Sequence, residues 1–276
     1  MIKSSADLQK CIQAHLGSDF EKSLFEASLD FLDQNKSALK YNAFAFSLRE
    51  LFRHIMERLA PDDSVKACSW FKQDSNIEAG RLTRFQRFKY TIQRGLEDKF
   101  SAEELGIDPA DCWSEVKAAI DSLSKLTHVG PKTFGLNDEE GDKLVFEALN
   151  AIWTILASVE DARTALEAEL HRYIDQAVTD ASIRETNTQI DLLSSNSIVE
   201  GVSVENWEIT SLDSLSIHFQ GNGTATVTLG WGRGDDHADL TEDFPFSFIG
   251  TSPTNSPRAP RIEPQKINID TSEWFG

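Results

Sequence analysis

The spacing of apolar residues changes once along this 276-residue chain, near residue 190. Before that point apolar residues recur every three or four positions, which is the period of an α-helix with one buried face. After it they alternate with polar residues, which is the period of a half-buried β-strand. We therefore expect an α+β protein, with an α-helical domain over residues 1–190 and a β-rich domain over residues 195–276.

Helix boundaries can be predicted from apolar spacing and from end signals. Residues 44–59 carry apolar side chains at helical spacing, and Pro61 ends this helix because its ring cannot continue the backbone hydrogen bonds. Residues 109–128 form another helix, which begins at a proline and ends before a Gly-Pro pair. The longest helical pattern extends over residues 137–193. Together these segments predict an α-helical bundle.

Short alternating stretches predict the strands of the second domain. They are residues 202–204, 215–219, 224–229, 244–249 and 267–270. The triplet Gly221-Asn222-Gly223 has the composition of a hairpin turn, so we expect it to connect two of these strands. Strands of this length favour a small antiparallel β-sheet or a sandwich.

The chain is strongly acidic, with a formal net charge of -18 and a pI near 4.7. Such a surface repels phosphate backbones, so the charge excludes broad, nonspecific binding of nucleic acid. Nucleic acid is then expected only at a local basic site. Hydrophobic residues make up 40% of the chain, which is enough for a packed core.

The sequence also bears on localisation and cofactors. No apolar run is long enough to span a membrane, and the first residues lack the apolar core of a signal peptide. Cys11, Cys68 and Cys112 are odd in number and widely spaced, which favours reduced thiols over a disulfide framework. No Cys or Cys/His cluster has structural-zinc spacing. We therefore expect a cytoplasmic protein without a membrane partner and predict no cofactor.

A basic segment at residues 81–94 stands out against this acidity, because it carries five cations and no acid. On a helix, Arg84 and Arg87 lie along one side, while aromatic residues such as Phe88 lie on another and are most simply core residues. Arginine can bind phosphate through two parallel hydrogen bonds. Arg84 and Arg87, supported by Lys89, are therefore candidate substrate-binding residues. The alternative is that these cations form ion pairs with the protein's own carboxylates.

A second candidate group is the stretch 47–54, which holds Arg49, Arg53 and His54. An imidazole can take the proton of a ribose 2′-hydroxyl or protonate the leaving oxygen, and a guanidinium can stabilise the charged phosphorane. Arg49 and His54 are therefore candidate catalytic residues, with Arg53 as a candidate substrate-binding residue. The alternative is a polar helix face with one partly buried histidine.

His128 is a third catalytic candidate, because it stands near the expected C-terminus of a helix. The negative end of the helix dipole favours the imidazolium, which suits a general acid. The alternative is a histidine that caps the last carbonyl groups. If these residues form one site, we expect His54 or His128 to lie close to the guanidinium group of Arg84 or Arg87.

Several segments of the chain resemble a bacterial family called predicted pPIWI-associating nucleases. They are Ser47–His54, Cys68–Phe71, Arg84–Tyr90, Leu123–Val129, Phe244–Phe246 and Asp270–Phe275. The resemblance extends from roughly residue 40 to the C-terminus. It implies a helical N-terminal unit followed by a β-rich tail, and nuclease activity in prokaryotic conflict or phage defence.

More distantly, Arg49 and His54 resemble the site of the HEPN helical RNases, which pair an Arg with a His a few residues later. In that class a polar turn usually follows the motif. Here that setting belongs to His128, which is preceded by Lys125 rather than by an Arg.

The favoured hypothesis is metal-independent RNA cleavage by Arg/His chemistry, in a prokaryotic defence system. The alternative is a non-catalytic interaction or regulatory module of a defence complex. A divalent metal stays open as a cofactor, because Glu50 and Glu57 lie on the same helix as His54 and could supply carboxylates. We expect nucleic acid at the local basic site, and a protein partner in a defence complex stays open. The sequence does not indicate an oligomeric state.

Overall fold

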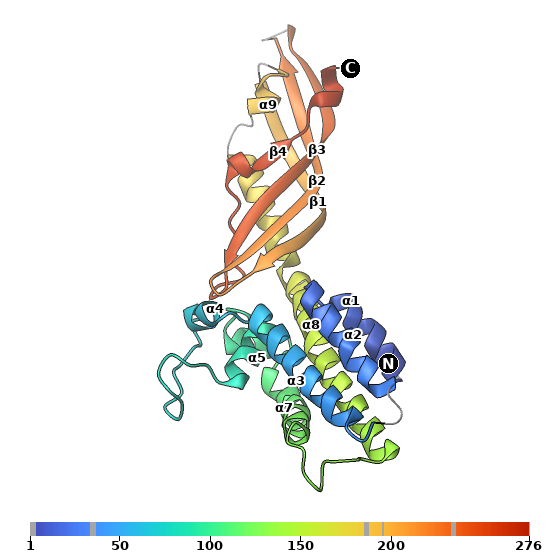
Figure 1. Cartoon of the computed structure of the whole chain (residues 1–276). Coiled ribbons are helices and arrows are strands. Elements are labelled where there is room, and N and C mark those ends of the chain that lie inside the picture. Colours follow the sequence, from blue (N-terminus) through green and yellow to red (C-terminus); the bar gives the residue numbers. More distant parts are fainter. Residues whose placement is uncertain (1–3, 34–36, 185–187, 195, 233–235, 276) are drawn as a thin grey trace. The chain divides into compact units, whose positions relative to one another are not determined.

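The structure is a computed structural model that describes residues 4–33, 37–184, 188–194, 196–232 and 236–275 (Figure 1). The α-helices precede residue 192 and a four-stranded sheet follows, which confirms the predicted α+β class. The helices are α1 (Ser5–His15), α2 (Asp19–Asp33), α3 (Lys40–Leu59), α4 (Asp62–Ala67), α5 (Arg84–Gln93), α6 (Asp98–Glu103), α7 (Pro109–Leu126), α8 (Asp138–Arg184) and α9 (Thr188–Asp191).

Two compact units make up the structure. We call residues 1–94 with 98–162 the helical unit, and residues 95–97 with 163–276 the β unit. The boundary between the two units falls inside α8, which is one continuous helix. The first strand begins later in the chain, at Asn196. The domain boundary that the sequence predicts, at residues 190–195, marks the change from helix to strand. Separate domains over residues 1–190 and 195–276 stay a prediction.

Helix α3 organises the helical unit, because it packs against α2, α5 and α7. Leu48, Leu51 and Ile55 are buried along one side of α3 at the spacing of a helix. They belong to a core that also includes residues of α5, α7 and α8: Phe88, Ile92, Val116, Ile120, Leu123, Leu149 and Ile152. Burying this apolar surface determines which sides of α3 and α5 stay free for polar side chains.

The helix ends follow the predicted signals with small shifts. Helix α3 ends at Leu59, just before the expected proline. At the start of α7 the side chain of Asp108 accepts a backbone hydrogen bond of 2.8 Å, and Pro109 occupies the first turn. The same helix ends at Leu126, so His128 follows it.

The β unit contains one antiparallel sheet in the order β1-β2-β3-β4. The strands are β1 (Asn196–Leu212), β2 (Ser216–Trp231), β3 (Ala238–Pro253) and β4 (Ile267–Ile269). Within the described residues this is a single sheet and not a sandwich. The apolar residues of one sheet face are buried, as are those along one side of α8: Ile217, Phe219, Val227, Leu229, Phe246, Phe248, Leu166, Leu170, Ile174 and Val178.

Helix α8 also bonds directly to strand β1 inside the β unit. Glu167 accepts a hydrogen bond of 3.1 Å from the backbone N–H of Ile209, and Arg163 donates one of 2.5 Å to the carbonyl of the same residue. Arg163 and Glu167 are themselves 3.2 Å apart. The pair therefore satisfies backbone groups of an edge strand that would otherwise be open to another chain.

The predicted turn at Gly221-Asn222-Gly223 is wrong, because β2 runs straight through it. Gly221 pairs with Phe248 and Gly223 pairs with Phe246, both on β3. A Cβ atom on Gly221 would lie 2.5 Å from the Phe248 ring, and one on Gly223 would meet the backbone oxygen of Ser203. The glycines are needed for the close approach of strands and aromatic rings, rather than for a change of chain direction.

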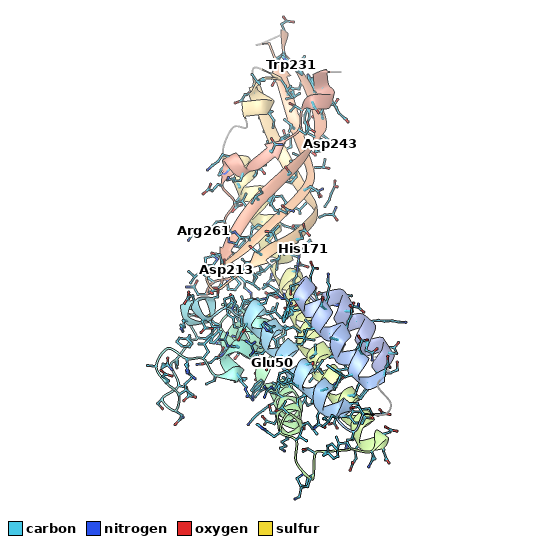
Figure 2. All side chains as sticks on the ribbon, in the orientation of Figure 1. Glu50, His171, Asp213, Trp231, Asp243 and Arg261 are labelled. Atoms are coloured by element: carbon cyan, nitrogen blue, oxygen red, sulfur yellow. The ribbon has the colours of Figure 1, made fainter. Side chains whose placement is uncertain are left out.

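The opposite face of the sheet is polar. Thr224 donates a hydrogen bond of 2.7 Å to Glu205 on β1, and Thr226 donates one of 2.6 Å to Asp243 on β3, a residue labelled in Figure 2. Cross-strand pairs of this kind stabilise an antiparallel sheet. The four strands contain no Lys or Arg, so they offer neither side chain to an anionic ligand.

Candidate nucleic-acid site

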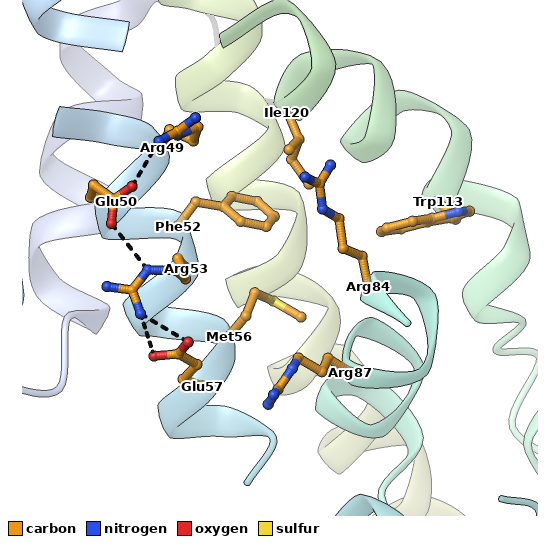
Figure 3. Close-up of a pocket in the computed structure, with 10 residues that line it drawn as sticks. All are labelled: Arg49, Glu50, Phe52, Arg53, Met56, Glu57, Arg84, Arg87, Trp113 and Ile120. Atoms are coloured by element: carbon orange, nitrogen blue, oxygen red, sulfur yellow. Dashed lines mark hydrogen bonds and ion pairs between the residues drawn. The ribbon is translucent and has the colours of Figure 1, made fainter. Parts of the chain in front are cut away.

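Four arginines line one pocket in the helical unit (Figure 3). Arg49 and Arg53 extend from α3, and Arg84 and Arg87 extend from α5. The cavity has a volume of about 260 Å³. Its other walls combine two carboxylates with apolar side chains: Glu50, Glu57, Phe52, Met56, Trp113 and Ile120. We call this cavity the arginine pocket.

Helix α5 presents its cations through its own capping and packing. The Thr83 hydroxyl accepts a hydrogen bond from the backbone N–H of Gln86 (3.0 Å), and the Gln86 side chain accepts one from the backbone N–H of Thr83 (2.8 Å). Phe88 is fully buried in the core. The positions of Phe88, Arg84 and Arg87 agree with the predicted division into a core-facing aromatic side and a cationic flank. Arg94 of the same segment differs, because it follows the helix and donates to the carbonyl of Leu59. Arg84 and Arg87 lie on the flank and reach the arginine pocket.

Two carboxylates on α3 hold the arginines of the same helix. Glu50 accepts hydrogen bonds of 3.0 Å from both Arg49 and Arg53, and Glu57 accepts two of 2.9 Å from Arg53. Burial alone would raise the pKa of Glu50, but the hydrogen bonds from Arg53 and Arg49 outweigh it and lower that pKa. Hydrogen bonds to Glu50 and Glu57 raise the pKa of Arg53. Glu50 and Arg53 are therefore fully charged at neutral pH.

The two arginines of α5 differ in how tightly they are held. Arg87 forms an ion pair with Asp62 and donates a hydrogen bond of 2.8 Å to the carbonyl of Ala60, and its side chain is only 22% exposed. Arg84 lies 3.5 Å from Asp121, and its side chain is 64% exposed. Arg84 is therefore the pocket arginine most available to an incoming anion, since exposed ion pairs are weak.

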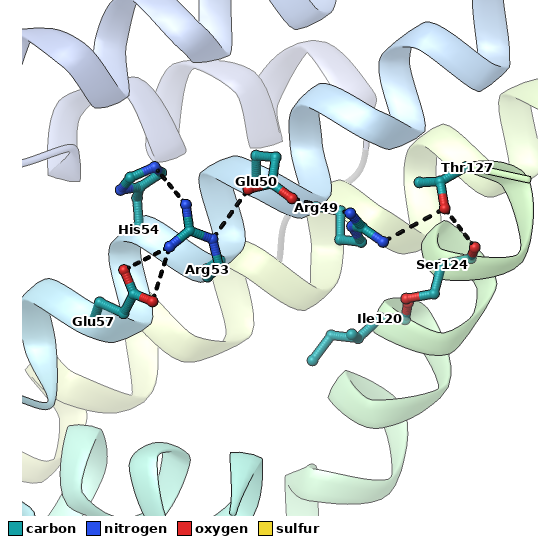
Figure 4. Close-up of polar contacts among 8 residues, drawn as sticks. All are labelled: Arg49, Glu50, Arg53, His54, Glu57, Ile120, Ser124 and Thr127. Atoms are coloured by element: carbon teal, nitrogen blue, oxygen red, sulfur yellow. Dashed lines mark hydrogen bonds and ion pairs between the residues drawn. The ribbon is translucent and has the colours of Figure 1, made fainter. Parts of the chain in front are cut away.

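His54 contacts the arginine pocket through Arg53 and does not line it (Figure 4). Its Nε2 lies 3.0 Å from Nη2 of Arg53. A guanidinium can only donate, so this contact is a hydrogen bond in the tautomer that carries its proton on Nδ1 and leaves Nε2 as the acceptor. The ring also packs edge-on against Phe20 of α2, with centroids 4.8 Å apart.

Arg49 connects the arginine pocket with the end of α7. Its Nη1 lies 3.5 Å from the hydroxyl of Thr127, which in turn donates a hydrogen bond of 2.8 Å to the carbonyl of Ser124 (Figure 4). His128 is the next residue, and its side chain is exposed and does not line the pocket. Its own carbonyl accepts a hydrogen bond of 2.8 Å from Thr133.

Lys89 lies outside the arginine pocket. Its Nζ is 2.6 Å from a carboxylate oxygen of Asp98 and 4.5 Å from the centre of the Trp70 ring. The turn between α5 and α6 brings Asp98 to it, and this turn could not be foreseen from the pattern of cations. Lys89 is thus fixed by the protein's own groups.

The structure brings four of the predicted site residues together and leaves three apart. Arg49, Arg53, Arg84 and Arg87 line one cavity, while His54, His128 and Lys89 do not. Within the described residues, neither histidine makes a hydrogen bond to Arg84 or Arg87. A single site formed by the histidines and these arginines stays a prediction.

Trp113 lines the arginine pocket from α7, although no sequence motif marks it as a site residue. The residue lies on an amphipathic helix among other apolar residues, so its spacing does not distinguish it from a core residue. Its position beside the arginines depends on how α5 packs against α7, which is a tertiary contact. No local signal could have identified it.

The described part of the chain contains neither a metal-ligand cluster nor a helix able to span a membrane. Among the residues that the structure describes, no three His, Cys, Asp or Glu side chains gather closely enough to hold a metal ion. Over the same residues, no helix is both long and apolar enough to cross a membrane.

Comparison with known proteins identifies the family of the chain. Two family models match it, over residues 13–152 and 159–275, and both are described as predicted pPIWI-associating nuclease. No curated protein and no solved structure matches the chain. The two matches cover nearly the whole sequence and support a nuclease function with nucleic acid as the ligand. The chain therefore belongs to the family of predicted pPIWI-associating nucleases.

Proposed function

We propose that this protein cleaves RNA without a metal ion and binds the phosphodiester backbone in the arginine pocket. The observation that carries the proposal is the convergence of four arginines from α3 and α5 on one cavity, with His54 in contact with Arg53. Guanidinium groups bind phosphate oxygens through paired hydrogen bonds, and their positive charge stabilises a phosphorane. The strongly acidic remainder of the chain restricts such binding to this place.

In this proposal Arg84 makes the first contact with a phosphate, because it is the most exposed of the four arginines. The phosphate then draws Arg53 away from Glu50 and Glu57. That movement also removes the guanidinium from Nε2 of His54, which leaves a free lone pair on this nitrogen. Substrate binding and activation of the base are thereby coupled through one side chain.

The proposed chemistry is an intramolecular transesterification. His54 takes the proton of the 2′-hydroxyl, the 2′-oxygen forms a bond to phosphorus, and the bond to the 5′-oxygen breaks. The leaving oxygen receives a proton, for which His128 is the candidate donor. The products are a 2′,3′-cyclic phosphate and a 5′-hydroxyl end. DNA lacks the 2′-hydroxyl and is not cleaved by this route.

The test is incubation of the purified full chain with end-labelled RNA and DNA, with and without a chelator. We expect cleavage of RNA in both conditions, none of DNA, and none of RNA in which every 2′-hydroxyl is methylated. His54→Ala should reduce the rate by about a hundred-fold or more, as expected for loss of a general base. Chelator-sensitive cleavage of DNA would contradict the proposal.

A second candidate function is that of a non-catalytic interaction module. The observation in its favour is that each pocket arginine already has an acidic partner: Glu50 for Arg49, Glu50 and Glu57 for Arg53, Asp121 for Arg84 and Asp62 for Arg87. Cations held in this way serve the fold or a protein partner. No cleavage of RNA or DNA, with His54→Ala and His128→Ala behaving like the wild-type protein, would favour this function.

We further propose that the protein acts in the cytoplasm of a prokaryote as part of a defence complex. The support is the description of its family, which names association with pPIWI proteins. Co-expression with a pPIWI protein and purification through a tag on one chain tests this proposal. Separation of the two chains during gel filtration would argue against a stable complex.

A further inference from the structure

The arginine pocket contains one large aromatic side chain that the proposed chemistry does not use, namely Trp113. Its ring is partly exposed and projects from α7 toward the cavity, as Arg84 does from α5 (Figure 3). The ring packs against Phe88 and Phe85, with centroid distances of 5.1 and 5.6 Å. Phe88 is fully buried, so the indole rests on a fixed support.

The indole N–H of Trp113 is free to donate a hydrogen bond to a ligand or to solvent. Among the described residues nothing accepts a hydrogen bond from it. The indole N–H groups of Trp70, Trp207 and Trp231 donate to Arg94, His171 and Leu193 at 2.8 to 3.1 Å. Within the part of the chain that the structure describes, Trp153 and Trp274 have no acceptor either. The missing acceptor therefore does not by itself distinguish Trp113; what does is that its ring lines the arginine pocket.

The lining of the cavity, whose volume is about 260 Å³, suits the two chemical parts of a nucleotide. Phe52, Met56 and Ile120 form an apolar part of the wall beside Trp113, and the arginines supply positive charge at the same cavity. A planar base suits the apolar part and its phosphate suits the arginines.

We propose that Trp113 stacks on an unpaired base while Arg84 binds the adjoining phosphate, so that the pocket selects single-stranded nucleic acid. The bases of a duplex are stacked on each other and cannot present a face to an indole. An unstacked base in a loop or single strand can, and protein aromatic rings bind such bases with little dependence on sequence. This inference rests on the proposed function for its location, because it assumes that nucleic acid enters the arginine pocket.

Binding of a non-cleavable ligand to the full chain tests the inference. The ligand is a short, fluorescent, 2′-O-methylated RNA, used as a single strand and as a duplex with its complement. We expect the single strand to bind at least about ten-fold more tightly than the duplex. Trp113→Leu keeps an apolar side chain without the ring and should weaken single-strand binding by about ten-fold, the loss expected for one stacked base.

Trp153→Leu is the matched control, because Trp153 lies in the helical unit, packs on the same core and does not line the pocket. It should bind the single strand like the wild-type protein. If Trp113→Leu fails to fold, Trp113→Phe and an oligonucleotide with one base removed provide the second measurement. Both should lower the affinity by a few-fold, as expected when stacking area is lost.

Binding measurements test the stacking role of Trp113, and cleavage measurements test the proposed nuclease activity. Equal affinity for single strand and duplex, no binding of either, or unchanged binding by Trp113→Leu overturns the inference. Cleavage of RNA combined with any of these results leaves the proposed function standing. Binding that depends on Trp113, without cleavage of ordinary RNA, supports the inference and contradicts the proposed function.

Discussion

Helix α5 of the helical unit and the strands of the β unit carry charges of opposite sign. Helix α5 carries Arg84, Arg87 and Lys89 with no acidic residue, and two arginines of α3 line the same cavity as two of these. The four strands hold six acidic residues and no Lys or Arg: Glu200, Glu205, Glu208, Asp239, Glu242 and Asp243. The net charge of -18 agrees in sign with the sheet, which repels phosphate, but it conceals the local cationic side of α5.

The largest expected effect comes from removing one core phenylalanine from each unit. Phe88 and Phe219 are both fully buried, so replacement by alanine should lower the free energy of unfolding by about 3–5 kcal/mol in each case. Phe88→Ala also removes the support of α5 and Trp113, so binding of RNA should be lost in protein that remains folded. Urea denaturation and fluorescence anisotropy measure the two effects.

Phe219→Ala is the matched variant in the β unit. Its stability loss should be similar, yet the folded protein should bind RNA as the wild-type chain does. If both variants lose binding to the same degree, nucleic-acid binding does not reside in the helical unit alone.

The second prediction concerns the arginines themselves. The double substitution Arg53→Ala and Arg84→Ala should weaken RNA binding by roughly a hundred-fold or more, because each charge-assisted hydrogen bond contributes about 1.5–3 kcal/mol. Arg261→Ala removes an exposed arginine of the β unit and should leave binding unchanged. A filter-binding titration at fixed salt measures both. If the double variant and Arg261→Ala lose RNA affinity equally, the binding surface does not lie in the arginine pocket.

The comparison also shows which parts of the molecule were predictable from sequence. The α+β class and the two sides of α5 follow from periodicity, which is a local property that neighbouring segments do not change. Arg84 and Arg87 line one cavity with Arg49, whereas a single site that includes His54 or His128 stays a prediction. The acidic partners of Arg84 and Arg87 lie far along the chain, as Asp121 does for Arg84, and could not be predicted.

Other contacts were unpredictable for a similar reason. The ion pair of Lys89 with Asp98 depends on a turn that the cation pattern does not reveal, and a role of Lys89 in substrate binding stays a prediction. The glycines of β2 were predicted to form a turn. Composition alone does not distinguish a reversal of chain direction from a position where an aromatic ring packs directly on the backbone. In both cases the decisive contact is tertiary.

The third prediction tests that explanation of the glycines. Gly223→Ala should destabilise the protein by about 1–3 kcal/mol, because the added methyl group would meet the backbone of Ser203 and the ring of Phe246. Gly201→Ala lies in the same sheet and has open space for the methyl group, so its effect should be smaller. Thermal unfolding measures the difference. Equal melting temperatures would show that close packing is not what requires glycine at residue 223.

The smallest expected effect is the pH dependence that Glu50 confers on the helical unit. Its pKa is lowered in the folded state, since the hydrogen bonds from Arg53 and Arg49 outweigh the opposing effect of burial. The resulting stabilisation is present above the ordinary Glu pKa of about 4.3 and is lost as pH falls through the lower folded value. Glu50→Gln should therefore be less stable than the wild-type protein near neutral pH, by less than about 1 kcal/mol.

The difference between wild-type and Glu50→Gln stability should shrink as the pH is lowered from about 5 to about 3, because protonation neutralises the wild-type carboxylate there. In an Arg53→Ala background the same comparison should give a smaller change, since one of the two hydrogen bonds that lower the pKa is absent. Urea unfolding at a series of pH values measures both. A stability difference that is constant over this range would mean that the arginines do not hold Glu50 ionised. Glu50 would then have no reason to compete with a substrate phosphate for the guanidinium group of Arg53.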